Sequence, residues 1–182
     1  MTSAIHIINS SSLTTPALKA IALTVEKIFM IPVIVEHVPM SISIAFDNSR
    51  GQCHSTMLIG QILSQHNTKN DKWVAIVDVD LYIPILTFVF GEAQFDGNAA
   101  VVSTHRLTNQ FYGLPTNDKL IVQRLEKEVV HELGHTFGLY HCHQFECVMR
   151  SSTYVEEIDL KQPFPCDQCA FWLIHQGTII NN

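Results

Sequence analysis

Short runs of apolar and β-branched residues, several alternating with polar positions, recur through the first hundred residues and predict strands. They are residues 4–9 (AIHIIN), 32–38 (PVIVEHV), 73–80 (WVAIVDVD), 86–93 (LTFVFGEA) and 99–107 (AAVVSTHRL). The last two are separated by a turn cluster that contains Gly97 and Asn98. Residues 41–46 (SISIAF) fit either a short strand or a loop edge.

Three other stretches have the apolar spacing of helices. They are residues 15–29, residues 53–66 and a stretch that starts near 115–120 (PTNDKL) and continues into HELGHTF, where Gly138 ends it. The alternation of strands and helices predicts an α/β (α+β) fold whose mixed sheet has a mainly parallel core and an antiparallel edge.

The composition changes after the third helix. Residues 143–182 contain three cysteines, two nearby prolines and little regular periodicity. We therefore expect one domain with an upper lobe at 1–138 and a lower lobe at 139–182. A lower lobe of this size buries little surface and would benefit from a bound metal.

Composition and charge narrow the function classes. Apolar residues make up 47% of the 182 residues, which excludes a disordered chain, and 11 Lys+Arg against 17 Asp+Glu gives a net charge of −6. A negative net charge argues against nucleic acid as a partner, because nucleic-acid-binding surfaces are basic. The N-terminal segment lacks a signal-peptide pattern and no apolar run reaches membrane-spanning length, so we expect a cytoplasmic protein without a membrane partner.

The stretch HELGHTFGLYHC (131–142) carries the candidate chemistry. His131 and His135 are one helical turn apart, so both imidazoles reach one metal ion. Gly138 permits a turn that brings His141 in as a third ligand, which leaves one position of a tetrahedral zinc ion open, as in catalytic sites. Glu132, about 100° round the helix, would act on a water at that position as general base and then acid. The alternative is a solvated, histidine-rich helix face.

Four cysteines follow in two pairs and suit a closed, structural zinc site. They are Cys142, Cys147, Cys166 and Cys169. Two disulfides or a redox-active C-x-x-C pair are the alternatives, and the cytoplasmic expectation favours zinc. Cys53, next to His54, could suggest a nucleophile, but its simpler interpretation is a small buried residue. Asp78 and Asp80 could suggest a cation site, but their simpler interpretation is a capping or strand-end role.

These motifs resemble the metzincin metallopeptidases, and the cysteine pattern together with the dipeptide Val148-Met149 resembles the archaemetzincins among them. The resemblance implies a metzincin-like, two-lobed fold with a twisted five-stranded sheet, an antiparallel edge strand at about 86–91 and two long helices. It also implies that Met149 forms the Met-turn, an apolar floor beneath the three histidines. From the residues alone, Met149 could equally fill the core.

The expected function is therefore a peptidase with two zinc ions, one catalytic and one structural, acting on a peptide substrate in an aminopeptidase-like manner or on short peptides. The alternative is a non-catalytic zinc protein that binds peptides or a protein partner through its edge strand. The presence of Glu132 beside the histidines opposes this alternative. The sequence does not predict an oligomeric state.

Overall fold

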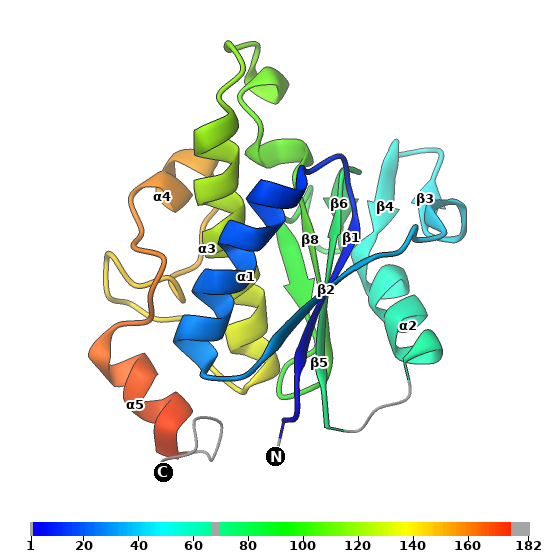
Figure 1. The fold of residues 1–182 in the computed structure, drawn as a ribbon. Coiled ribbons are helices and arrows are strands. Elements are labelled where there is room, and N and C mark those ends of the chain that lie inside the picture. Colours follow the sequence, from blue (N-terminus) through cyan, green and yellow to red (C-terminus); the bar gives the residue numbers. More distant parts are fainter. Residues whose placement is uncertain (1, 67–69, 176–182) are drawn as a thin grey trace.

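The computed structural model describes residues 2–66 and 70–175, and its centre is a five-stranded mixed sheet (Figure 1). The strand order is β2-β1-β5-β8-β7, with the first four parallel and β7 antiparallel to β8. The strands are β1 (Ile5–Ser10), β2 (Val33–His37), β5 (Lys72–Val77), β7 (Gly91–Ala93) and β8 (Ala99–Ser103). The sheet confirms the predicted fold class.

Helices cover both faces of this sheet. The two long helices, α1 (Thr15–Phe29) and α3 (Asp118–Thr136), pack on one face, and α2 (Ser55–Gln65) lies on the other (Figure 1). Alternate strand residues divide between the two cores: Ile76 faces α1 and α3, whereas Ala75 and Val77 belong to the cluster around α2. Because both faces are covered, β5 and β8 are almost entirely apolar, as expected of central parallel strands.

A second, three-stranded sheet lies beside α2. It consists of β3 (Phe46–Asp47), β4 (Gln52–His54) and β6 (Leu81–Tyr82). The ambiguous stretch at 41–46 is a 3₁₀ turn, η1 (Ile42–Ile44), that ends at the start of β3. The helix expected from residue 53 begins at Ser55, and Cys53 is a fully buried residue of β4, as its simpler interpretation predicted.

The predicted edge strand at 86–91 is placed wrongly. Pairing with β8 begins only at Gly91 and runs to Ala93. The Phe90 carbonyl still accepts from the Ser103 N–H of β8 at 2.8 Å, but the Val89 N–H donates to the Leu81 carbonyl 2.9 Å away, which ties the preceding residues to β6. Residues 86–90 therefore cross between the two sheets, and β7 itself is short.

The C-terminal part contains two helices that its irregular composition did not predict. They are α4 (Val155–Asp159) and α5 (Asp167–His175); the 3₁₀ turns η2 (His105–Leu107) and η3 (Gln110–Tyr112) precede α3. Buried residues of α4 and α5 join the core around α1 and α3. The division of the chain into lobes at Gly138 stays a prediction. Among the helices of residues 2–66 and 70–175, none is long and apolar enough to cross a membrane.

Candidate metal centre

The helix α3 carries the first two histidines and is fastened at both ends. At its start, the Asn117 side chain accepts a hydrogen bond from the Leu120 N–H at 3.0 Å, a standard N-cap. At its end, Lys72 Nζ donates to the Thr136 carbonyl at 2.9 Å, which satisfies one of the free carbonyls of the last turn. Gly138 then has φ of +84°, the left-handed conformation that turns the chain back as predicted.

The three histidines converge. Their candidate ligand atoms lie within 4.8 Å of one another, and the Nε2 atoms of His131 and His135 are 3.2 Å apart. This is close to the separation of about 3.3 Å for two nitrogens bound to one zinc ion at about 2.0–2.1 Å in tetrahedral geometry. His141 comes from the loop after Gly138 and is the most exposed of the three.

The outer nitrogens fix how two of these rings point. His131 Nδ1 lies 2.8 Å from the Val148 carbonyl, and His135 Nδ1 lies 2.7 Å from the Leu139 carbonyl. A carbonyl only accepts, so each Nδ1 carries the proton and each Nε2 directs its lone pair at the shared centre. Burial lowers the pKa of all three imidazoles, most strongly that of His131, which keeps them in the neutral form that binds metal.

Glu132 is buried beside this centre, between α3 and the edge strand. It is 5% exposed, and the residue opposite it is Gly91 of β7. A Cβ at position 91 would lie 2.7 Å from Glu132 Cγ and 2.8 Å from the Val101 carbonyl. The Glu132 side chain can therefore lie against β7 only because residue 91 is glycine. Burial, followed by repulsion from Glu128 and Glu92, raises the pKa of Glu132 well above its usual range; a dication at the histidines would oppose this.

Met149 is fully buried and packs against α3 at Gly134. A Cβ at position 134 would lie 2.4 Å from Met149 Sδ, so only glycine leaves space for the thioether there. The carbonyl of Met149 accepts a hydrogen bond from the Cys142 N–H at 2.9 Å, which joins this segment to the loop of His141. Sequence reasoning missed Gly134 and Gly91; the only local signal for Gly134 was a helix-disfavouring glycine inside a helix.

The four predicted cysteines form a second cluster. Their sulfur atoms lie within 4.8 Å of one another, and the pairs Cys142–Cys166 and Cys147–Cys169 are each 3.8 Å apart. All are free thiols rather than disulfides. In a tetrahedral zinc site with Zn–S bonds of about 2.3 Å, sulfurs are separated by about 3.8 Å, so this donor set fits zinc.

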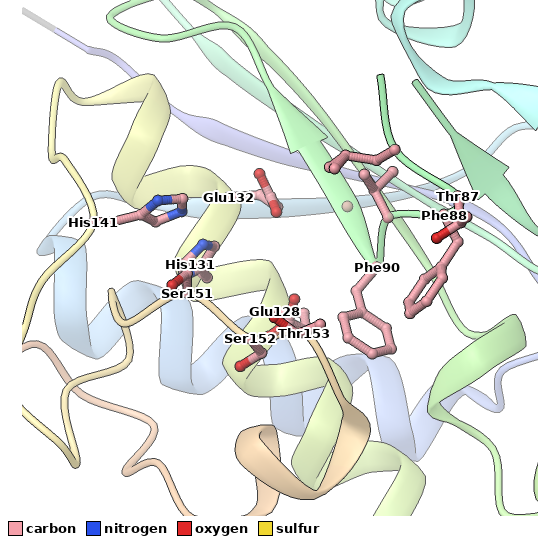
Figure 2. A pocket seen from close by; sticks show the side chains of 13 residues that line it. Thr87, Phe88, Phe90, Glu128, His131, Glu132, His141, Ser151, Ser152 and Thr153 are labelled. Atoms are coloured by element: carbon pink, nitrogen blue, oxygen red, sulfur yellow. The ribbon is translucent and has the colours of Figure 1, made fainter. Parts of the chain in front are cut away.

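A cavity of about 330 Å³ opens beside the histidines (Figure 2). Its walls come from the crossing segment 86–90 and Gly91, from α3, from His141 and from residues 151–153. Figure 2 labels ten of the lining residues, among them His131, Glu132, His141 and Glu128.

The two strand-end aspartates lie outside this cavity and serve the fold. Asp80 pairs with Arg106 through bonds of 2.6 and 2.7 Å, and Asp78 accepts from Thr104 Oγ1 and the Ser12 N–H. The structural interpretation of Asp78 and Asp80 fits these contacts.

Comparison with known proteins identifies the family of the chain. The sequence profile of Peptidase family M54 matches residues 12–175. The chain belongs to Peptidase family M54. Membership confirms the prediction of a metallopeptidase among the hydrolases, and the relatives of the chain confirm the resemblance to archaemetzincins.

Among the M54 relatives, the archaemetzincin of Thermococcus kodakarensis is 51% identical over 107 residues, which are 59% of this chain and 58% of that protein. The archaemetzincin of Methanocaldococcus jannaschii is 40% identical over 137 residues, 75% of this chain and 74% of that protein.

Two solved structures share the fold. A zinc-dependent peptidase from Methanocorpusculum labreanum superposes with a TM-score of 0.84 at 27% identity, covering 93% of this chain and all of that one. The archaemetzincin of Methanopyrus kandleri gives 0.83 at 30% identity, covering 98% and 97%.

Proposed function

We propose that this M54 peptidase cleaves peptides with a zinc ion held by His131, His135 and His141 and with Glu132 as general base and acid. The observation that carries the proposal is the convergence of the Nε2 lone pairs beside a buried carboxylate. A purely structural zinc site is closed by four protein ligands, whereas these three imidazoles leave a position free.

A zinc ion bound there would polarise the substrate carbonyl and draw the pKa of a water molecule toward about 7. The protein's own part is proton transfer. Glu132 takes the proton of the attacking water and passes it to the leaving amine. Its burial between Gly91 and α3 holds the carboxylate in place and excludes bulk water.

The four cysteines would hold a second, structural zinc ion. None of the four cysteines lines the cavity that His131 and Glu132 share. The ligands of this site join the His141 loop, through the adjacent Cys142, to the start of α5, which carries Cys169. Such a site stabilises the C-terminal segment rather than taking part in catalysis.

The substrate is a peptide bound along the cavity and the edge of the sheet. Because β7 is the last strand in the order, an extended peptide can pair with its outer backbone groups. We expect aminopeptidase-like cleavage or cleavage of short peptides. The cytoplasmic location and the absence of nucleic-acid and membrane partners stay predictions from the sequence.

The test is digestion of a mixed peptide library by zinc-loaded wild type and by Glu132→Ala, with products identified by mass spectrometry. Loss of the general base should lower kcat/KM by about 10²- to 10⁴-fold. Zinc content should not change, since Glu132 is not a ligand. If neither protein cuts although both bind zinc, a peptide-binding zinc protein replaces the peptidase, and the termini of any products separate aminopeptidase from endopeptidase activity.

A further inference from the structure

Two residues that line the cavity carry buried polar atoms that lack partners. Glu128 lies one helical turn before Glu132 and is 3% exposed, yet its Oε1 has no hydrogen-bond partner among the described residues. Ser152 Oγ, from the segment after Met149, is also buried and unpartnered there. Both residues line the cavity, and Figure 2 labels both below His131 in its view. Buried polar atoms without partners are rare, which points to a group supplied from outside the chain.

The neighbouring cation does not complete this site. Lys161 Nζ lies 3.8 Å from Glu128 Oε1, longer than a hydrogen bond, and 3.5 Å from the Val148 carbonyl. Lys161 is not among the residues that line the cavity, so it approaches the carboxylate from behind. Burial raises the pKa of Glu128 and Lys161 opposes that rise, and a second cation on the cavity side would oppose it further.

Part of the cavity wall is apolar. Phe88, Phe90 and Val89 from the crossing segment line the same cavity as Glu128 and Ser152. Long basic side chains have an aliphatic stem that packs on apolar surface and a charged head that needs polar partners. A cavity whose walls carry a carboxylate and a hydroxyl as well as apolar side chains matches that distribution.

We propose that this cavity selects substrates whose residue next to the scissile bond ends in an amine or guanidinium group, with Glu128 and Ser152 as the residues that bind it. The inference rests on the proposed peptidase function and names its substrate class. The competing explanation is that Glu128 only pairs with Lys161 inside the fold and that the cavity has no preference for charge.

The experiment compares two peptides that differ only in lysine or norleucine beside the cleaved bond, placed on either side of it in turn. Wild type should prefer lysine by about 10-fold or more in kcat/KM, because norleucine leaves the polar atoms unpaired. Glu128→Gln should bring the ratio close to one. Glu156→Gln, an exposed carboxylate on α4 away from the cavity, is the matched control and should keep the wild-type ratio.

Because Glu128→Gln leaves Lys161 buried without its counter-charge, the double variant Glu128→Gln/Lys161→Met provides a folded comparison with neither charge. It too should lose the lysine preference. If wild type cleaves both peptides equally, or if the preference survives in the double variant, the inference fails while the peptidase function stands. If wild type cleaves neither these peptides nor the mixed library, the proposed function fails and the inference with it.

Discussion

At position 134 the helix α3 has no side chain, and the Met149 thioether occupies that space. The contact joins the residue before His135 to the segment whose Val148 carbonyl holds the His131 ring. The positions of His131 and His135 thus depend on residue 134 being glycine, because even the methyl group of alanine would displace Met149.

Gly134→Ala should destabilise the protein by about 1–3 kcal/mol through overpacking, because the new Cβ would lie 2.4 Å from Met149 Sδ. Zinc affinity at the histidines should fall as well. Thermal unfolding and zinc competition titration measure the two effects.

Gly60→Ala is the matched control, since Gly60 lies within α2 with open space where its Cβ would be. That change should stabilise by about 0.5–1 kcal/mol, the gain expected for alanine over glycine in a helix. Equal effects of the two substitutions would show that the contact with Met149 is unimportant.

The sequence predicted the candidate ligands residue by residue, but it did not predict the residues that contact them in the fold. His131 and His135 lie one helical turn apart, so local periodicity alone places them on one face. Gly91 matters because it faces Glu132, 41 positions along the chain, and no local pattern encodes that contact. In the sequence Glu128 is one of several polar residues of a helix, and no local pattern indicates the cavity beside it.

The ends of α3 matter at the scale of elements, since this helix delivers two histidines and Glu132. Lys72, at the start of β5, donates to the Thr136 carbonyl and, at 2.6 Å, to the Gly97 carbonyl. It thereby ties the last turn of α3 to both β5 and the turn before β8.

Lys72→Met should cost about 1.5–3 kcal/mol of stability, the range for hydrogen bonds to a charged group. The loss should appear as faster amide hydrogen exchange in the last turn of α3. Lys19→Met, at an exposed position of α1, removes the same charge without such contacts. Unchanged exchange in the Lys72 variant would rule out this capping role.

Elements with strong patterns were predicted correctly, including α1 and β5, because burial on one or both faces leaves a clear record in the sequence. The C-terminal helices were missed because α4 has five residues and α5 has only two buried residues, Cys169 and Leu173, to mark its inner face. The edge strand was misplaced because residues 86–90 have strand-like composition but pair with β6 through Val89 only.

For the whole molecule, the three histidines and the four cysteines together predict how many zinc ions each chain binds. Wild type should contain two zinc ions per chain, while His131→Ala and Cys169→Ser should each contain one. Cys53→Ala should still contain two, because Cys53 is buried in β4, away from both clusters. Elemental analysis of dialysed protein gives the ratio, and a ratio of one in wild type would contradict the second site.

The overall architecture could be predicted only in part from residues. The strand and helix order indicates a mixed sheet, and the resemblance to a family supplied the number of strands and the two long helices. The spatial order of the strands was not predicted. Long-range pairing such as β5 between β1 and β8 depends on the whole chain, which local patterns do not record.

Cys142 directly follows His141, whereas Cys169, the last cysteine of the cluster, lies on α5. During synthesis on the ribosome, the three histidines therefore emerge before the cysteines that secure the loop of the third. If the four cysteines hold zinc as proposed, a nascent chain that has just exposed Glu132 still lacks the ligands of that site. The proposed catalytic centre would then be complete only after α5 has been made, so hydrolysis would begin only in the folded molecule.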